Sequence, residues 1–285
     1  GLSCDAEVEL IENGGFETPA VSTPQLWNIY PSGTATLGWS VAWLPGANSF
    51  SSLTRPQIAQ LEYQRGYAGW LPFEGQQYAE LDADWDGPAG SVTGEPAQIA
   101  ISQTLSTVVG EEYKLSFYFS PRPQTVAAQN SLKVWIDGSL VLTVPATAPA
   151  ANTNWTHYEH TFTASGSSTL VEFKDAGTPS DSYGTFLDDV SVKCILKEVD
   201  ALESIVINEF LPNPTGSDSA LKPGGEWVEL YNLSGTPVDV AGWVLYDAID
   251  SHELPITNSN TDTGDTVVPA LGWLVVYRNG DGDFS

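Results

Sequence analysis

Apolar and polar residues alternate in short runs along the first two thirds of the chain. Runs with the period of two that is typical of half-buried β-strands span residues 77–81, 98–105, 112–119, 131–136, 157–162, 169–173 and 185–192. Asp137-Gly138, directly after the fourth run, is a tight hairpin signal. The pattern predicts an all-β domain, in which residues 20–75 form long loops and only residues 55–65 favour a short helix.

A second block of strand-like runs lies near the end of the chain, at residues 226–232, 238–247 and 271–278. Between the two blocks, residues 197–204 hold three acids and one Lys. We therefore expect one β-sandwich over residues 1–196, a short linker over 197–204 and a second domain over 205–285.

The charge balance excludes some classes of partner. The 285 residues include 36 Asp and Glu against 10 Lys and Arg, a formal net charge of −26. Because binding to a phosphate backbone needs basic side chains, nucleic acid is not expected as a partner, and an anionic membrane is a poor one. No apolar stretch of about 18 residues predicts insertion into a membrane. The acidity fits the solvated surface of a secreted protein, and also carboxylates that bind divalent cations. The absence of Met predicts a mature or excised segment.

The second domain carries a recognisable pattern. The run Ile207–Pro214, followed by Glu226–Asn232, Val238–Asp247 and Leu271–Arg278, resembles the lamin-tail domain, an immunoglobulin-like β-sandwich. The resemblance implies a non-catalytic module for interaction or anchoring. Few residues follow Tyr277, so this sandwich is expected to be incomplete at its C-terminal end. Either the chain continues beyond Ser285, or the second domain self-associates or accepts the missing strand from another chain.

The first domain also resembles a known family. Asn13–Glu17 near the start and Phe186–Val192 near the end are similar to the terminal motifs of the galactose-binding-like jelly roll of many carbohydrate-binding modules. In that fold the first and last strands are neighbours. The resemblance therefore implies that Glu17 and Asp188, with Asp189 beside it, hold a structural calcium ion. The alternative is that these carboxylates only cap a loop or accept hydrogen bonds.

The same neighbouring strands imply a disulfide between Cys4 and Cys194. Such a bond closes a long loop and stabilises the fold by about 4–5 kcal/mol in the chain-entropy model. It would place the protein outside the cell or on the cell surface, where the setting is oxidising. Two unpaired thiols are the alternative.

A second cation site is suggested by the residues alone. Asp82, Asp84 and Asp86 occupy alternate positions before Gly87, as in the first half of a calcium loop. The second half departs from that pattern, because Thr93 stands at position 12 and Glu95 comes two residues late. The alternative is an acidic surface turn.

Aromatic side chains in the loops are the candidates for sugar contact, because ring faces stack on the apolar faces of pyranoses and polar groups bind the hydroxyls. A core role is the alternative for each tryptophan. The candidates are Trp70 and Trp85 foremost, then Trp39, Trp43 and Trp27, with Tyr118 and Arg122 at the end of a strand.

No catalytic motif stands out. His157 and His160 fall on opposite faces of a strand, and nucleophile elbows, phosphate loops and zinc-type clusters are absent from the sequence. We expect a secreted, calcium-stabilised, non-catalytic protein that binds a cell-wall or extracellular polysaccharide. One alternative is a structural subunit of a surface assembly, such as an S-layer, a pilus-like filament or a matrix. Another is the targeting arm of a larger secreted enzyme.

Overall fold

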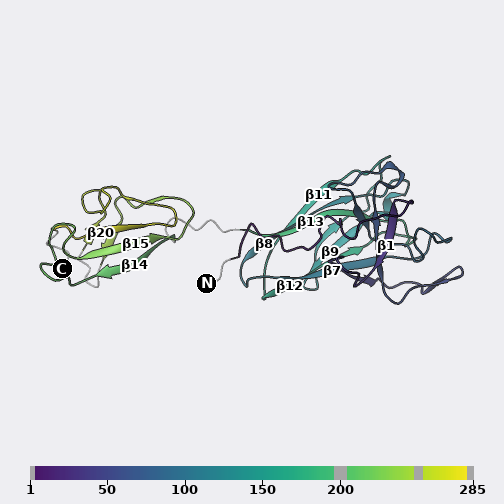
Figure 1. Cartoon of the computed structure of the whole chain (residues 1–285), viewed down its shortest axis with the longest axis horizontal. Helices are drawn as coiled ribbons and strands as arrows, with labels where there is room; N and C mark the ends of the chain where they lie inside the picture. The colour runs from purple at the N-terminus through teal and green to yellow at the C-terminus, as the bar shows by residue number, and fades with distance from the viewer. Residues whose placement is uncertain (1–3, 196–203, 247–252, 281–285) are drawn as a thin grey trace. The chain divides into compact units, whose positions relative to one another are not determined.

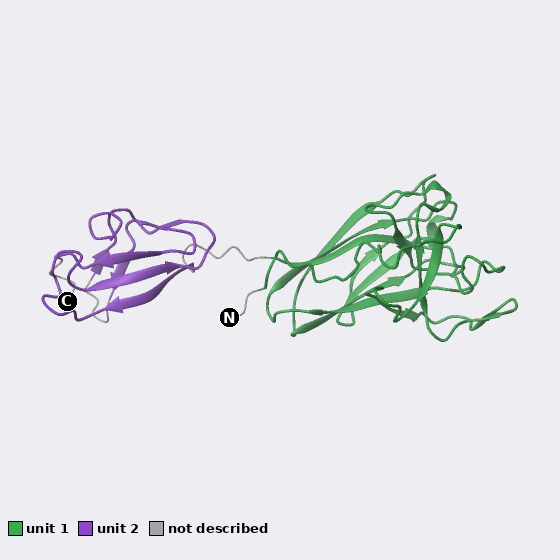
Figure 2. Cartoon of the chain, in the orientation of Figure 1, with its two compact units in different colours: residues 1–196 green, residues 197–285 purple. Residues whose placement is uncertain are grey.

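The computed structural model describes residues 4–195, 204–246 and 253–280, and the predicted linker, 197–204, lies almost wholly outside these ranges. The chain forms two compact units, residues 1–196 and 197–285 (Figure 2). Both units are built from β-strands (Figure 1).

Two antiparallel sheets make up the first unit, in the layers of a jelly-roll-like β-sandwich (Figure 1). The six-stranded sheet has the order β1 (Trp27–Pro31), β5 (Gln60–Gln64), β6 (Tyr78–Glu80), β13 (Phe186–Ile195), β8 (Glu112–Ser120) and β11 (Thr156–Thr163). The five-stranded sheet has the order β10 (Ser139–Val144), β9 (Leu132–Ile136), β12 (Ser168–Asp175), β7 (Ile99–Ser106) and β2 (Ser40–Trp43). A small hairpin, β3 (Ser49–Phe50) with β4 (Leu53–Thr54), stands apart from both sheets.

Alternation along the strands fills the core between the sheets. In β8, Tyr113, Leu115, Phe117 and Phe119 are buried, while the side chains between them are exposed or half-buried. Successive side chains of a strand point to opposite faces, so one face of each sheet becomes apolar and is removed from water. The core that results joins residues from both sheets, among them Phe117 and Phe173, whose rings meet edge to face.

Each of the strand-like runs expected between residues 77 and 192 contains a strand, from β6 to β13. The hairpin expected at Asp137-Gly138 joins β9 to β10, and both turn residues have positive φ, 47° and 78°. This is the backbone that a two-residue turn requires, and Gly adopts it without steric cost.

The expectation for residues 55–65 is wrong. They form no helix, and residues 60–64 are strand β5. Leu61 and Tyr63 are fully buried in the core, and burying both requires a period of two, which a helix does not have. Residues 20–75, expected as long loops, also contain β1, β2 and the β3–β4 hairpin.

The N-terminal segment lies alongside β13. The N–H of Leu10 donates to the carbonyl oxygen of Val192, and the N–H of Val190 donates to that of Gly14, both at 3.0 Å. A Cβ at Gly14 would lie 1.9 Å from the oxygen of Val190, so the close approach requires Gly. The segment is irregular rather than a strand. The disulfide between Cys4 and Cys194 is present, with the two Cα atoms 5.9 Å apart.

Small sheets make up the second unit. A three-stranded sheet has the order β14 (Ile205–Leu211), β15 (Trp227–Asn232) and β20 (Trp273–Tyr277), and two pairs accompany it, β16 (Val238–Asp239) with β19 (Val267–Val268) and β17 (Val244–Tyr246) with β18 (Glu253–Pro255). Its core contains Leu230, Val238, Val240, Leu254, Ile256, Val268, Leu274 and Val276. Each unit therefore has a hydrophobic core of its own.

Among the residues that the structure describes, helical structure contributes little to either unit. The first unit has two short 3₁₀ turns, Tyr67–Gly69 and Ala127–Gln129. Within the described part of the chain, no helix has the length and apolar character that crossing a membrane would require.

Candidate ligand-binding cleft and carboxylate cluster

Strand register collects polar side chains on the outer face of the six-stranded sheet. Glu62 and Gln64 alternate with the core residues of β5, so they point away from the core. Gln64 pairs with Trp27 on β1, and Glu62 pairs with Glu80 on β6. Residues directly opposite each other share a face. The register therefore places an aromatic ring, an amide and two carboxylates side by side.

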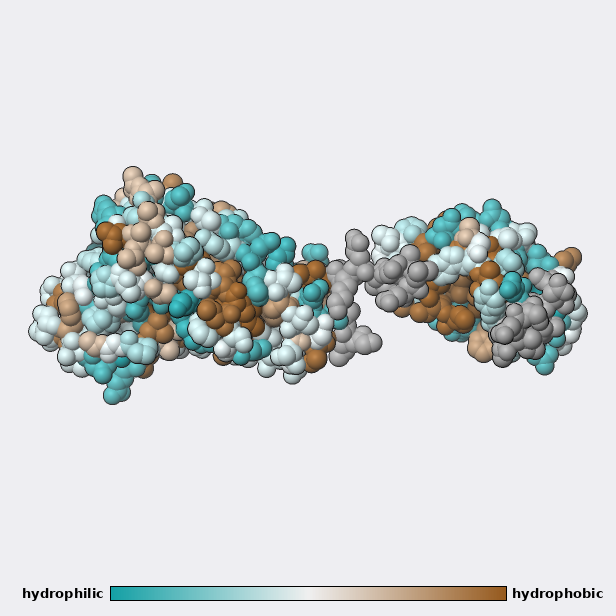
Figure 3. Space-filling model, turned by 180° about the vertical axis from the view of Figure 1, so that it is seen from behind, coloured by the Kyte–Doolittle hydropathy of each residue, from teal (hydrophilic) through white to brown (hydrophobic). Residues whose placement is uncertain are grey.

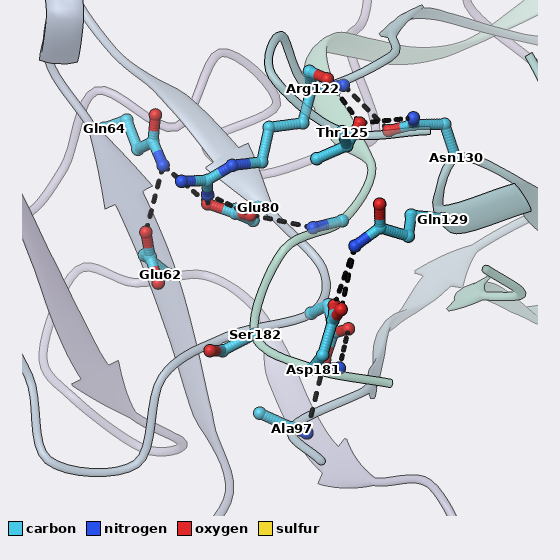
Figure 4. Close-up of polar contacts among 12 residues, drawn as sticks. Glu62, Gln64, Glu80, Ala97, Arg122, Thr125, Gln129, Asn130, Asp181 and Ser182 are labelled. Atoms are coloured by element: carbon cyan, nitrogen blue, oxygen red, sulfur yellow. Dashed lines mark hydrogen bonds and ion pairs between the residues drawn. The ribbon is translucent and has the colours of Figure 1, made fainter. Parts of the chain in front are cut away.

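The amide and the two carboxylates, together with Arg122, form a connected hydrogen-bond network around Glu80 (Figure 4). The guanidinium of Arg122 donates through Nη1 to both carboxylate oxygens of Glu80, at 2.6 and 2.7 Å. Gln64 Nε2 donates to Oε2 of Glu80 at 2.5 Å and to Oε1 of Glu62 at 3.1 Å. The N–H of Gly184 donates to Oε1 of Glu80 at 2.9 Å. Every partner is buried, so these contacts hold the side chains in fixed orientations.

Aromatic rings surround the guanidinium of Arg122. Its central carbon lies 4.6 Å from the ring centroid of Tyr183, 5.4 Å from that of Trp70 and 6.0 Å from that of Phe186. These distances permit cation–π attraction, which is stronger where water is excluded. The rings therefore stabilise a charged group at a buried position.

Burial and neighbouring charges shift the pKa values of the two carboxyl groups in this network. Burial, and then the negative charge of Glu80, raise the pKa of Glu62 well above its usual range. Burial also raises the pKa of Glu80, but the charge of Arg122 and the hydrogen bonds to Glu80 oppose that rise. The arrangement fits a protonated Glu62 beside an ion pair of Glu80 and Arg122. A protonated carboxyl can donate a hydrogen bond as well as accept one.

A cleft opens above the network. Its volume is about 90 Å³, below the roughly 300–1,000 Å³ of pockets that enclose a small molecule. It can admit one edge of a ligand but not a whole sugar ring. Its lining combines aromatic rings with polar groups: Trp27, Glu62, Gln64, Tyr67, Asp84, Thr93, Arg122, Ser182 and Tyr183.

The structure brings only two of the residues expected to contact a sugar into this cleft, Trp27 and Arg122. Trp39, Trp70 and Trp85 are buried, with 3%, 3% and 4% of their surface exposed. Their ring faces are covered by protein, which corrects the expectation that these loop tryptophans offer platforms to a ligand. They are buried because loops fold back over the sheets, so a position in a loop did not imply exposure.

Two of these buried tryptophans pack on another aromatic ring instead. Trp39 stacks on Phe16 in the main core, with ring centroids 5.6 Å apart. Trp70 packs against Phe186 and lies beside the guanidinium of Arg122. Trp70 therefore supports the cleft from inside the protein.

The other two candidates lie elsewhere. Trp43 is half-buried, and its indole N–H donates to the carbonyl oxygen of Pro56 at 2.8 Å. Tyr118 stacks on the exposed ring of Phe73, with centroids 3.4 Å apart, and lines a separate polar hollow that also contains His157 and Asp189.

Sequence reasoning missed six residues that line the cleft, namely Glu62, Gln64, Tyr67, Thr93, Ser182 and Tyr183. A signal for the first two was present. In Gln60–Gln64 the apolar residues Leu61 and Tyr63 alternate with polar ones, which is a strand pattern. The expectation of a short helix over residues 55–65 obscured it, and no local signal marks Tyr67 or Tyr183.

Glu17 and Asp188 come from opposite ends of the chain, and both accept hydrogen bonds from the backbone of one loop, residues 73–77. Glu17 Oε1 accepts the N–H groups of Gln76 and Gln77, at 2.7 and 2.9 Å. Asp188 Oδ2 accepts those of Phe73 and Glu74, at 2.8 and 3.1 Å.

This geometry fits the hydrogen-bonding alternative for the pair. Burial raises the pKa of Asp188 to about 8, against hydrogen bonds that lower it, including one from Asp189 N–H to Oδ1 at 2.8 Å. Within the described ranges, neither Glu17, Asp188 nor Asp189 belongs to a group of three His, Cys, Asp or Glu residues whose ligand atoms lie within 4.8 Å of one another. Calcium at this pair stays a prediction.

Unlike the pair Glu17 and Asp188, the acidic loop after β6 brings three carboxylates together. Asp84, Asp86 and Glu95 do form such a group, with ligand atoms all within 4.8 Å of one another. Burial, and then the negative charge of Glu95, raise the pKa of Asp84 to about 8. Asp82 points elsewhere and accepts the N–H groups of Ala97 and Asp181, at 3.2 and 2.9 Å. The cluster therefore contains two of the three expected aspartates and the glutamate that the loop pattern placed too late.

Comparisons with known proteins agree with this architecture. Residues 198–284 match the family model of the Lamin Tail Domain, and residues 91–193 match a family described as a protein of unknown function, DUF642. A comparison with curated proteins finds no match.

Solved structures that are similar to the chain are distant in sequence. They include a Stig cyclase, Fisc, from Fischerella sp. TAU, at 15% identity and a TM-score of 0.43, covering 67% of this chain and 99% of that one. TmCBM61, solved in complex with β-1,4-galactotriose, has 16% identity and a TM-score of 0.32, covering 66% and 99%. A family 35 carbohydrate-binding module from an environmental isolate has 12% identity and a TM-score of 0.30, covering 45% and 79%. The chain joins a jelly-roll-like β-sandwich, of which residues 91–193 match DUF642, to a second β unit that matches the model of the Lamin Tail Domain.

Proposed function

We propose that the first unit binds a neutral glycan in the cleft above β1, β5 and β6, without catalysing a reaction. The observation that carries the proposal is the buried network of Glu62, Gln64, Glu80 and Arg122 beside the half-buried ring of Trp27. Sugar recognition needs these two elements together: an apolar ring surface for one face of a pyranose and oriented polar groups for its hydroxyls.

The charge of the site selects the kind of ligand. Burial raises the pKa of Glu62, and a protonated carboxyl at this position would offer a donor as well as acceptors, which suits hydroxyl groups. The net charge of −26 repels polyanions, so an uncharged polysaccharide is favoured over an acidic one. Because the cleft is small, it would hold the edge of one sugar while the rest of the glycan stays on the surface.

The setting that we propose is extracellular or on the cell surface. The disulfide between Cys4 and Cys194 supports an oxidising compartment. The lamin tail domain would then anchor or present the glycan-binding unit. If the chain is part of a longer secreted protein, the same cleft would direct that protein to its polysaccharide.

Binding to a broad panel of neutral and acidic glycans, followed by calorimetry on the best ligand, tests the proposal. Trp27→Ala should weaken binding about tenfold or more, because it removes the ring that lines the cleft. Trp43→Ala is the matched control, since this ring is also half-buried in the first unit but lies outside the cleft. Retention of full affinity by folded Trp27→Ala protein, or a loss in Trp43→Ala that is as large, would contradict the site.

A second candidate function is assembly through the second unit. Strand β14 is at one end of its sheet, and its apolar side chains are exposed, among them Ile207 and Phe210 at 60% and 65%. Apolar side chains gather on the face of this unit that Figure 3 shows. An exposed apolar edge strand favours pairing with a second copy of the chain. Sedimentation velocity would then show a concentration-dependent dimer that Phe210→Ser weakens, whereas a monomer at all concentrations would rule this function out.

A further inference from the structure

We propose that Asp84, Asp86 and Glu95 bind one calcium ion, which fixes the loop between β6 and β7 and thereby one wall of the cleft. The loop positions these three carboxylates precisely enough for their ligand atoms to lie within 4.8 Å of one another. Two oxygens on opposite sides of a calcium ion are separated by about 4.6–5.2 Å, twice the usual calcium–oxygen distance. The three side chains therefore fit around a single ion.

Backbone hydrogen bonds orient each carboxylate. Asp84 Oδ1 accepts the N–H groups of Asp86 and Gly87, at 2.8 and 2.7 Å. Glu95 Oε1 accepts the N–H of Trp85 at 2.9 Å, and Asp86 Oδ2 accepts the N–H of Ser91 at 3.0 Å. Backbone N–H groups thus fix one oxygen of each carboxylate, and this fixes the orientation of the second oxygen as well.

Two of the remaining oxygens are buried without a hydrogen-bond partner, Oε2 of Glu95 and Oδ1 of Asp86. Glu95 is completely buried, with 0% of its surface exposed. A buried carboxylate oxygen that lacks a partner is costly, and a bound cation is one of the few ways to satisfy it. This observation is independent of the acidity of the loop, and it points to a ligand at the centre of the group.

The local backbone leaves room for this arrangement. A Cβ at Gly90 would lie only 2.0–2.3 Å from the carboxylate atoms of Asp86, so a side chain at Gly90 would displace that carboxylate. Gly87 has a φ of 73°, which turns the chain directly after the first two ligands. Oxygen donors alone, three of them charged, are the set that a hard divalent cation prefers.

The cluster adjoins the cleft, because Asp84 also lines it, as does Thr93 in the same loop. An ion that holds Asp84 and Glu95 together would fix this wall before a ligand arrives. The expected coupling between calcium and glycan rests on the proposed function, whereas the binding of the ion does not.

Terbium luminescence measures the ion directly. Trp85 stands between two of the ligands in the chain, so excitation of indole should sensitise terbium bound at the cluster. Chelator-treated full-length chain should show saturable emission, which calcium displaces and an equal concentration of magnesium does not. Absence of saturable emission, or displacement by magnesium as effective as that by calcium, would overturn the assignment.

Charge-removing variants locate the ion. Glu95→Gln keeps an oxygen for the Trp85 N–H and replaces the unpartnered oxygen with an amide, and Asp86→Asn does the same kind of exchange. Each should weaken calcium binding at least tenfold. Glu17→Gln is the matched control, because it removes one carboxylate charge from the other predicted site while an oxygen remains for Gln76 and Gln77. Unchanged affinity in both cluster variants, or a loss that appears only in Glu17→Gln, would overturn the proposal.

Unfolding temperatures and glycan binding complete the test. In chelator, the unfolding temperature of folded Glu95→Gln protein should be no lower than that of the parent protein. Calcium should raise the unfolding temperature of the parent protein but not that of the variant. An equal rise in both would contradict the site. If calcium binds the cluster but leaves glycan affinity unchanged, only the coupling is wrong. If no glycan binds at all, the proposed function fails while the terbium and calcium results still decide the ion.

Discussion

At the scale of single residues, the first unit buries more acids than its bases can neutralise. Glu62, Glu80, Asp82, Asp175 and Asp188 are all nearly inaccessible, and burial raises the pKa of each. The structure compensates through backbone amides, shared protons and a single buried guanidinium near the cleft. Such groups stabilise the fold only while their partners stay in place.

Arg122 should be the most sensitive of these partners. Arg122→Met would leave the carboxylate of Glu80 buried without its cation, and we expect a loss of about 3–5 kcal/mol in the free energy of unfolding, measured by guanidinium denaturation. Adding Glu80→Gln should recover part of that loss, because the stranded charge is removed. The control is Arg65→Met at an exposed position, which should cost under about 1 kcal/mol. A small effect of Arg122→Met would show that the ion pair does not hold the network.

Asp175 should make stability depend on pH. Burial raises its pKa to about 7, against hydrogen bonds from Gln98, Thr185 and Gly177 that lower it. Gln98 Nε2 donates to Oδ2 of Asp175 at 2.6 Å. In the unfolded chain the group ionises near pH 4, so between pH 4 and 7 the folded state retains a proton that the unfolded state releases. The contribution of Asp175 is therefore complete below pH 4 and lost as the pH rises through 7. The unfolding temperature should fall from pH 5 to pH 8, and less steeply in Asp175→Asn. Equal slopes in the two proteins would contradict this assignment.

At the scale of elements, the sequence was most informative where a strand stands between clear turns. Strands β6 to β9 and β11 to β13 follow from alternation because one face of each must enter the core. Strand β5 did not, because residues 55–65 were expected to form a short helix. Missing β5 also meant missing the cleft, because Glu62 and Gln64 become site residues only when the register sets them opposite Glu80 and Trp27.

The candidate cation site also depends on contacts that residue spacing along the sequence does not show. A loop pattern found Asp84 and Asp86 from their spacing, but spacing also selected Asp82, which turns toward the backbone of Ala97 and Asp181. Glu95 joins the cluster because residues 87–94 fold back on the loop, and a linear template does not contain that information. Likewise, the burial of Trp70 and Trp85 depends on which surfaces the loops cover.

At the scale of the whole molecule, two separate cores predict two unfolding transitions. The disulfide between Cys4 and Cys194 closes nearly all of the first unit into one loop, with a sequence separation of 190 residues. A cross-link of that length stabilises mainly by restricting the unfolded chain, so its effect belongs to the first unit.

Replacing both cysteines with serine should therefore lower the stability of the first unit by about 2–5 kcal/mol and leave the transition of the lamin tail domain unchanged. Scanning calorimetry resolves the two transitions, and denaturant titration gives the free energy of the first. Reducing agent added to the parent protein should reproduce the shift, because it removes the same constraint without changing the sequence. A shift of both transitions together would mean that the cores do not unfold independently. No shift at all would mean that the hydrogen bonds of Leu10 and Val190 already hold the N-terminal segment on β13 in the absence of the cross-link.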